Sequence, residues 1–331
     1  MDKPRVCIVS PAAEGANNGN WHTAARWREF LAAVARVQVD VAWDGEPVAA
    51  LIALHARRSA RSIARYRHAA RDAPLAVVLT GTDLYRDIDS DESAQHALEC
   101  ASHVVVLQDE GLSRLDAATR VKARVIVQSA GARMPRGRAD DHFGLVAVGH
   151  LREEKDPLVL MQAARLLPAA SPVRIVHLGD ALDDTLADAA RQTAAAVPRY
   201  RWLGGVSHEE ARRWIARSHA LVHMSRMEGG ANVVIEAVRS RVPVLASRID
   251  GNVGLLGRHY EGYFPVGDAE ALASLIQRFQ ADPPFAAALA AQCAERAPRF
   301  APQVERHEVR KLLADLLSCG AHGGGAEKPT Q

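Results

Sequence analysis

Two glutamates eight residues apart form the clearest chemical pattern in this chain. Glu228 is followed directly by Gly229 and Gly230, and Glu236 lies on the helix-like segment that comes next. Glycines let a ligand approach the backbone closely, and the amides that open a helix attract anions. A carboxylate such as Glu236 can accept a hydrogen bond from each of the two hydroxyls of a vicinal diol. The pattern predicts a site for a phosphorylated ligand. The alternative is an acidic helix start with Glu236 in solvent.

An asparagine-rich loop follows the first apolar segment. Asn17, Asn18 and Asn20 surround Gly19, just before a helix-like segment. Asparagine tolerates left-handed backbone conformations and donates hydrogen bonds from its side chain. At a helix start the loop could bind a small anion. The alternative is an Asn/Gly turn that caps the helix.

Two further loops of the first half offer hydrogen-bond donors. Thr80, Gly81 and Thr82 follow one apolar segment, and Arg57 and Arg58 follow another. The hydroxyls and the Gly81 amide could reach a ligand, and guanidinium groups suit phosphate. For the arginines, the alternative is a solvated helix start.

No pattern in the sequence predicts a metal site. The strings Asp87-Ile88-Asp89 and Asp89-Ser90-Asp91 match a metal-binding spacing, but we interpret them as a solvated loop. The cysteines form no C-x-x-C pair, which argues against zinc and disulfides and favours a reducing cytoplasm. They are Cys7, Cys100, Cys293 and Cys319.

The elements that would position these residues are short apolar strands alternating with helices. This alternation predicts parallel sheets with both faces covered, and therefore an α/β fold of two doubly wound, Rossmann-like domains. The strands expected in the first half are residues 5–10, 37–43, 50–55, 75–80, 103–108 and 125–127. Those of the second half are residues 144–149, 173–179, 200–203, 220–223 and 242–246.

The domain boundary is expected in the polar, Gly- and Pro-containing stretch 131–141. This gives an N-terminal domain over residues 1–140 and a C-terminal domain over 141–300. Residues 319–331 are glycine-rich and are expected to be a disordered tail. Because ligands bind at the carboxyl ends of parallel strands, we expect an active site in a cleft that the two domains face.

Composition excludes several classes of protein. The 331 residues are 48% hydrophobic and 24% charged, with a net charge of +2, so a strongly basic nucleic-acid binder is not expected. No apolar run approaches the ~20 residues of a membrane helix. The first residues resemble a strand rather than a signal peptide. We therefore expect a cytoplasmic protein without nucleic-acid or membrane partners.

The second half resembles the glycosyltransferases of GT-B architecture that carry an E-x7-E motif (the family 4-like group). The matching segments are residues 148–157, 203–207, 228–236, 241–247 and 262–268. The resemblance implies that this domain binds a nucleotide-sugar, with Glu236 on the ribose and Glu228 on sugar hydroxyls. It also implies no cofactor beyond the nucleotide-sugar co-substrate and no required metal.

The same resemblance assigns Lys155 to the diphosphate, where its charge would stabilise the leaving group. A surface lysine is the alternative. His150 stands where the family usually has arginine, which weakens bidentate phosphate binding and makes it pH-sensitive; Arg152 could compensate. Lys155 and Glu228 are the catalytic candidates. The donor-binding candidates are His150, Arg152, Gly205, Val206, Met227, Gly229, Gly230, Ala231, Asn232, Val233 and Glu236.

Across both halves the chain resembles the selenosugar synthases of bacterial selenoneine biosynthesis. The segments that carry this resemblance are residues 10–20, 53–59, 79–84 and 148–157. It implies that selenophosphate reacts with a UDP-sugar, UDP-N-acetylglucosamine or UDP-glucose, to give a 1-seleno sugar, UDP and phosphate. A helix over residues 301–318 would return to the first domain. The acceptor-binding candidates are Asn17, Asn18, Gly19, Asn20, Arg57, Thr80, Gly81 and Thr82.

Selenophosphate is an anionic, soft nucleophile that needs no general base, which suits a sequence without an obvious His/Asp pair. Two alternatives stay open. One is a glycosyltransferase acting on the hydroxyl of a lipid or small metabolite, and the other is a non-catalytic nucleotide-sugar binder. The sequence leaves open which sugar is used, the anomeric configuration, selenium against sulfur, the fate of the Se–P bond and the oligomeric state.

Overall fold

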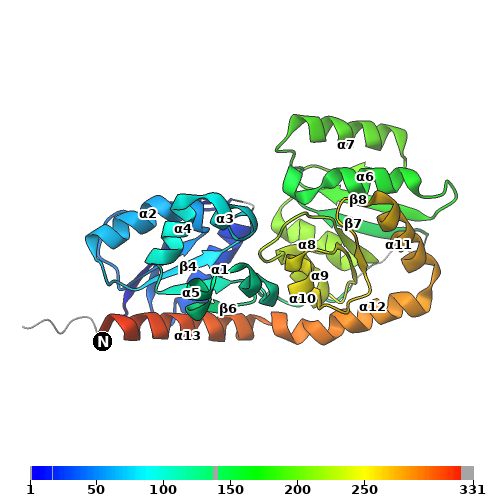
Figure 1. Ribbon diagram of the computed structural model, residues 1–331. Helices are drawn as coiled ribbons and strands as arrows, with labels where there is room; N and C mark the ends of the chain where they lie inside the picture. The colour runs from blue at the N-terminus through cyan, green and yellow to red at the C-terminus, as the bar shows by residue number, and fades with distance from the viewer. Residues whose placement is uncertain (1, 17, 136, 138–140, 322–331) are drawn as a thin grey trace, which may run out of the picture. The chain divides into compact units, whose positions relative to one another are not determined.

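The computed structural model describes residues 2–16, 18–135, 137 and 141–321. They form two compact units, Met1–Gln128 with Pro302–Gln331, and Ser129–Ala301. The first segment thus ends before the boundary expected at residue 140. Figure 1 shows a sheet with its own helices in each unit.

The first unit contains a six-stranded parallel sheet in the order β2-β1-β3-β4-β5-β6. Its strands are β1 (Arg5–Val9), β2 (Arg36–Asp40), β3 (Ala50–Leu54), β4 (Leu75–Leu79), β5 (His103–Val106) and β6 (Ala123–Val125). Its helices include α1 (Gly19–Leu31), α2 (Ala56–Ala69), α3 (Ile88–Ser90), α4 (Glu92–Cys100), α5 (Ala117–Val121) and α13 (Pro302–Ala321). A π-helical turn (Asp83–Asp87) follows β4, and a 3-10 helix (Asp109–Arg114) follows β5.

Both faces of this sheet are buried because alternate residues of each strand point to opposite sides. Ile8 of β1 packs in one apolar cluster with Trp27 of α1. Its neighbour Cys7 packs in the other cluster, with Ile63 of α2 and Leu98 of α4. This explains why the strands are almost continuously apolar.

Helix α13 belongs to the first unit. Leu312 and Leu316 pack in the same cluster as Trp27, and the Trp27 indole N–H donates to Glu305 Oε1 at 2.8 Å. Figure 1 shows α13 running alongside the first sheet. The helix continues to Ala321, so residues 319–321 are helical and not part of a tail. Residues 322–331 lie outside the described residues.

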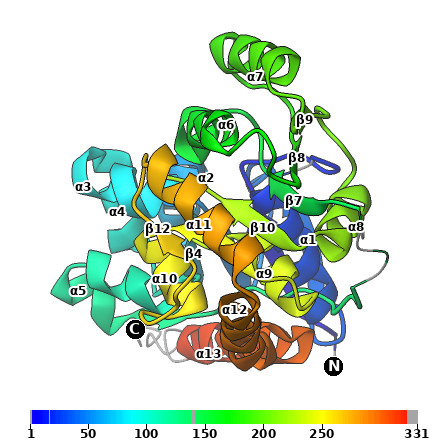
Figure 2. The ribbon, with the colours of Figure 1, turned by 90° about the vertical axis from the view of Figure 1, so that its right-hand side faces the viewer.

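The second unit has a six-stranded parallel sheet in the order β12-β11-β10-β7-β8-β9. Its strands are β7 (Phe143–Val148), β8 (Val173–Leu178), β9 (Tyr200–Trp202), β10 (Ala220–His223), β11 (Val244–Ser247) and β12 (Tyr263–Phe264). Its helices are α6 (Pro157–Leu166), α7 (Asp184–Ala196), α8 (His208–Arg217), α9 (Asn232–Arg239), α10 (Asp250–Leu256), α11 (Ala269–Ala281) and α12 (Pro283–Arg296). Figure 2 shows α6 beside α11, with α9, α10 and α12 grouped together.

Each sheet reverses its strand order once, between β1 and β3 and between β7 and β10. The loops that follow the two strands at such a point lead to opposite sides and leave a crevice where ligands bind. The predicted doubly wound α/β architecture is therefore confirmed. The two-residue strand β12 was not predicted. Among the described helices, none is long and apolar enough to cross a membrane.

Candidate functional site

Lys155 and Glu228 meet where the second sheet reverses its order. Lys155 ends a short 3-10 helix (Glu153–Lys155) after β7, and Glu228 lies in the loop after β10. The Lys155 ammonium group forms a hydrogen-bonded ion pair with Glu228 Oε1. The Arg226 amide donates to the Glu154 carbonyl at 2.9 Å and ties the two loops together. The structure thus brings both catalytic candidates into one contact.

The Glu228 carboxylate is held by several donors. Ser225 Oγ donates to Oε1 at 2.7 Å, and His223 Nε2 lies 3.4 Å from the same oxygen. Burial favours a raised pKa for Glu228, but the Lys155 charge and the His223 contact outweigh burial and hold this pKa well below its ordinary value. Glu228 is therefore ionised, and these contacts leave Oε2 for a ligand. His223 and Ser225 were not predicted.

Gly251, in the first turn of α10, allows this helix to approach Glu228 closely. A Cβ atom at Gly251 would lie 2.1 Å from the Glu228 carbonyl oxygen, which is backbone and cannot move aside easily. Close packing therefore requires a glycine at position 251. This residue lies outside every motif found in the sequence.

The first turn of α9 follows Gly229 and Gly230. Its N-cap residue, Ala231, provides no side-chain hydrogen bond, whereas Asp183 caps α7 and Asp268 caps α11 by accepting a backbone amide. The first amides of a helix have no partner within the helix. At α9 the N-cap side chain takes none of these amides, and anion binding by residues 229–233 stays a prediction.

Glu236, inside α9, is 5% exposed. Its Oε1 lies 2.5 Å from Nε2 of His208, the first residue of α8, whose side chain is 41% exposed. The donor-binding candidates Gly205 and Val206 lie just before α8 in the sequence. The His208 contact therefore joins Glu236 to the start of the helix that follows these two residues. His208 was missed, although it directly follows the recognised segment 203–207.

The remaining donor candidates lie on the loops around Lys155. His150 Nδ1 accepts from the Asp180 amide at 3.1 Å, and Arg152 Nε lies 3.9 Å from Glu154 Oε2. Met227 is partly buried beside Glu228. The loop after β7 packs closely against the end of β8. A Cβ atom at Gly179 would lie only 2.0 Å from the Gly149 carbonyl oxygen.

In the first unit, the asparagine loop begins a helix. Asn18 is the N-cap of α1, and its Oδ1 accepts from the Trp21 amide at 3.1 Å. Gly19 and Asn20 form the first turn. Asn17 lies outside the described residues. Asn18 therefore has the capping role that was the alternative to anion binding.

The Thr80–Thr82 candidates surround a buried carboxylate. The amides of Thr80 and Gly81 donate to Asp83 Oδ1 at 2.9 and 2.8 Å, and the Ala56 amide donates to Oδ2 at 3.0 Å. The Gly81 amide, which was expected to reach a ligand, is thus used inside the protein.

Arg57 is also engaged. Its Nε lies 2.9 Å from Asp91 Oδ2, and its NH1 lies 3.6 Å from Asp87 Oδ1. The interpretation of Asp87 as part of a solvated loop is wrong, because this residue is only 4% exposed. Among the described residues, no group of three or more His, Cys, Asp or Glu side chains is placed to hold a metal ion.

A histidine completes this cluster. His55 Nε2 lies 2.9 Å from Thr82 Oγ1, and His55 Nδ1 lies 3.8 Å from Asp83 Oδ2. The sequence shows no obvious His/Asp pair, whereas the structure brings His55 and Asp83 close together. The two residues follow different strands and are far apart in the sequence, so no local motif could reveal them.

Comparison with known proteins decides the family. The model of the family "Glycosyl transferases group 1" matches residues 132–300, just over half of the chain. The chain belongs to the group 1 glycosyltransferases. It is 23% identical over 308 residues to Glycosyltransferase 1 domain-containing protein 1 of Xenopus tropicalis, covering 83% of this chain and 88% of that protein.

Solved structures confirm the GT-B fold of this glycosyltransferase. Anabaena Alr3699/HepE, in complex with UDP and glucose, is similar with a TM-score of 0.74 and 15% identity, over 94% of this chain and 100% of that one. Sucrose-phosphate synthase from Thermosynechococcus elongatus has a TM-score of 0.77 and 18% identity, over 96% and 100%.

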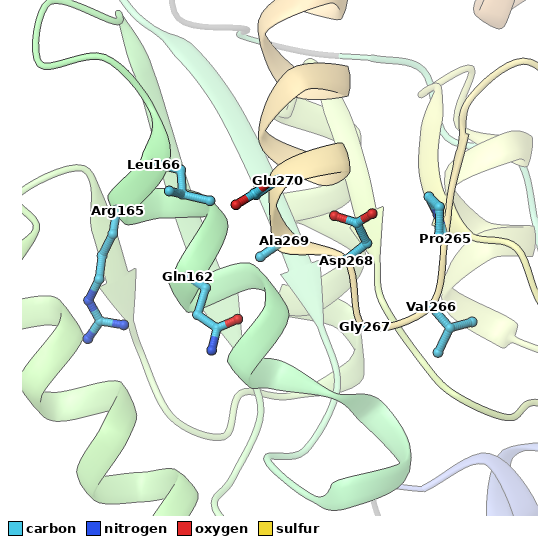
Figure 3. A pocket seen from close by; sticks show the side chains of 9 residues that line it. All are labelled: Gln162, Arg165, Leu166, Pro265, Val266, Gly267, Asp268, Ala269 and Glu270. Carbon is cyan, nitrogen blue, oxygen red and sulfur yellow. The ribbon is translucent and has the colours of Figure 1, made fainter.

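The glycosyltransferase also has a wide hollow in the second unit that contains none of the predicted site residues. Figure 3 shows Gln162 and Arg165 of α6 on one side of it and the start of α11 on the other. Asp268 there caps α11 by accepting from the Ala271 amide at 2.8 Å, and Arg165 donates to Thr193 Oγ1 at 2.7 Å. These groups already have partners, so the hollow adds nothing to the site.

Proposed function

We propose that this glycosyltransferase transfers the sugar of a UDP-sugar to selenophosphate. The C1–O bond to the diphosphate breaks as a C1–Se bond forms, and UDP leaves. Hydrolysis of the Se–P bond by water then gives phosphate and the 1-seleno sugar. UDP-N-acetylglucosamine or UDP-glucose is the proposed donor. The scattered cysteines suit a reducing cytoplasm as the place of the reaction.

The observation that carries the donor half is the Lys155–Glu228 pair at the order reversal of the second sheet, together with the uncapped start of α9. We assign the diphosphate to Lys155 and the α9 amides, the ribose to Glu236, and sugar hydroxyls to Glu228 Oε2. Gly205 and Val206 would lie near the base, with His150, Arg152 and Met227 around the phosphates. Structures of the similar Anabaena protein contain UDP and UDP-glucose, which supports this assignment.

The chemistry of the step follows from charge. As the sugar leaves the diphosphate, negative charge grows on the leaving oxygen. Lys155 would stabilise that charge without a metal ion. The selenium atom carries its own negative charge and needs no base. The protein must then hold the anionic acceptor in line with C1.

The acceptor half rests on the resemblance of segments in both units to selenosugar synthases. We assign the acceptor to the first unit, to Asn17, Asn18, Gly19 and Asn20 and to Arg57, Thr80, Gly81 and Thr82. Several of these groups have internal partners, and among the described residues the Thr82 hydroxyl is the donor that we propose for the acceptor.

One observation favours a second candidate, transfer to a hydroxyl acceptor. A hydroxyl needs a base to remove its proton. His55 is buried beside Asp83 and Asp87, and burial lowers the pKa of His55. A neutral imidazole could accept the proton through an Nε2 lone pair that faces Thr82, and this second candidate therefore requires the ring to be protonated on Nδ1.

A substrate panel separates the candidates. UDP-N-acetylglucosamine, UDP-glucose and GDP-sugars are each incubated with selenophosphate, thiophosphate or phosphate, and with small sugar alcohols. Products are detected by mass spectrometry. We expect a seleno sugar from a UDP-sugar. Glycosylated alcohol without a seleno sugar would favour the second candidate. UDP-sugar binding without any product would favour a nucleotide-sugar binder.

A further inference from the structure

His55 has an unusual backbone conformation for a buried side chain. It follows β3 with φ of 68°, in the region that favours glycine, and it is 3% exposed. Such a conformation is unfavourable for a residue other than glycine and persists only where the surroundings hold it. His55 is also the N-cap of α2, so the strain sits at the end of a strand that borders the order reversal of the first sheet.

The contacts of the His55 ring define its tautomer. Nδ1 accepts from the Arg58 amide at 3.4 Å as the cap of α2, so Nδ1 carries a lone pair. In a neutral ring the proton is then on Nε2. Burial lowers the pKa of His55, which keeps the ring neutral near pH 7. Nε2–H therefore donates to Thr82 Oγ1 at 2.9 Å.

This hydrogen bond determines what Thr82 can do. A hydroxyl has one proton to donate and lone pairs to accept. Its oxygen accepts from His55, and among the described residues this is the hydrogen bond that the Thr82 hydroxyl makes. Asp83, the next residue, is fixed by the amides of Thr80, Gly81 and Ala56. These bonds hold the loop beside Thr82 in place, and the hydroxyl keeps its own proton for a further hydrogen bond.

We propose that His55 is a positioning residue that turns the Thr82 hydroxyl into an oriented hydrogen-bond donor for an oxygen of the acceptor. The inference deepens the proposed function, because it assumes that the acceptor binds in the first unit. Asp83 and Asp87 are buried within 4.0 Å of the imidazole nitrogens. Because the His55 ring is neutral and these two carboxylates lie beside it, the Thr82 donor orients the acceptor without adding positive charge.

Two variants isolate this contact. His55→Asn keeps a residue that tolerates positive φ and an oxygen that can cap α2, but it removes the Nε2 donor. Thr82→Val removes the hydroxyl at nearly constant shape, and Thr82→Ser is the conservative control. With selenophosphate as acceptor, each of the first two variants should raise the acceptor KM about tenfold, as for one hydrogen bond to a charged group. The Kd of UDP should stay within twofold.

The double variant supplies the decisive comparison. Because both residues act through one hydroxyl, His55→Asn combined with Thr82→Val should be no worse than Thr82→Val alone. Additive effects on KM, a changed UDP Kd, or a Thr82→Ser variant as impaired as Thr82→Val would overturn the inference. Thermal unfolding of each variant checks that the fold is intact.

A spectroscopic test does not depend on the acceptor. Nitrogen-15 NMR of labelled protein at pH 7.5 should show His55 protonated on Nε2, with a shifted Nε2 signal in Thr82→Val. Protonation on Nδ1 would overturn the inference even if the enzyme makes seleno sugar. If His55 shows the expected tautomer but the enzyme does not use selenophosphate, the proposed acceptor is refuted. The positioning role of His55 would still hold.

Discussion

The two sheets of this glycosyltransferase reverse their strand order in the same way, but they use the backbone donors nearby differently. In the second unit, α9 begins at Ala231 without a side-chain cap, and Lys155 lies on the loop after β7. In the first unit, Asn18 caps α1, and Asp83 accepts from the amides after β4. The order reversal is thus accompanied by an uncapped helix start in the second unit and by internally bonded amides in the first.

This difference shows that topology places a ligand site but does not fix the charge of its ligand. A helix start attracts anions only while its amides are unoccupied. This contrast agrees with our proposal of a diphosphate site in the second unit and of a single oriented donor, Thr82, in the first. Four experiments test this contrast, from the largest expected effect to the smallest.

Removing the charge at Lys155 should have the largest effect. Lys155→Ala takes away the group that we propose to stabilise the leaving diphosphate, a loss of about 3 kcal/mol that should lower kcat at least a hundredfold. Steady-state release of UDP measures it. Lys311→Ala, on the exposed side of α13, is the matched control and should leave kcat unchanged. A Lys155→Ala enzyme with normal kcat would remove this residue from the mechanism.

Acid should destabilise the second unit through His177, which is buried beside the Tyr200 hydroxyl at 3.0 Å. Burial lowers the pKa of His177 from 6.5 to about 4. Between these values the unfolded chain binds more protons, so stability falls as the pH is lowered through this window, by about 3 kcal/mol in all. Denaturant unfolding at pH 7 and pH 4 measures this change. His177→Gln should reduce the pH dependence, and an unchanged dependence would contradict the assignment.

Neutralising Asp83 should weaken the first unit and leave the donor site intact. In Asp83→Asn, an amide group replaces an acceptor that serves three backbone amides. We expect a loss of about 2 kcal/mol in the free energy of unfolding. UDP affinity, measured by calorimetry, should not change. The control is Asp89→Asn, whose side chain is exposed beside Arg114 and should cost less than about 0.5 kcal/mol. Weaker UDP binding in Asp83→Asn would contradict the assignment of UDP to the second unit alone.

The smallest effect is expected at Glu236. Glu236→Gln removes the charge from the proposed ribose acceptor and should raise the Kd of UDP about tenfold, or about 1.4 kcal/mol. Glu270→Gln, exposed in the first turn of α11, is the control in the same unit. An unchanged Kd of UDP in Glu236→Gln would contradict the assignment of the ribose to Glu236.

Much of the fold could be predicted because each buried parallel strand leaves a local apolar signature. Residues 75–80, for example, were expected as a strand and contain β4. The strand β12 has only two residues, too few for any pattern. The Lys155–Glu228 and Glu236 candidates came from short motifs and their resemblance to a family, and the structure brings Lys155 and Glu228 together.

The features that were missed depend on contacts between distant segments. Asp83 accepts from Ala56, 27 residues away, and Gly251 matters only because α10 lies against Glu228. His223 looks like the end of an apolar strand, and nothing nearby in the sequence marks its place beside Glu228. Such roles follow from the sheet order, which sequence patterns do not encode residue by residue.

The return of residues 302–321 to the first unit affects the order in which the chain gains structure during synthesis. These residues leave the ribosome after the whole of the second unit's continuous segment. Until then, Trp27 lacks Leu312, Leu316 and the Glu305 carboxylate. The second unit can therefore complete its core first, although it comes later in the sequence. A nascent chain that stops before Pro302 would lack the apolar side chains that α13 adds to this cluster, and among the described helices α1 alone would cover that face of the first sheet.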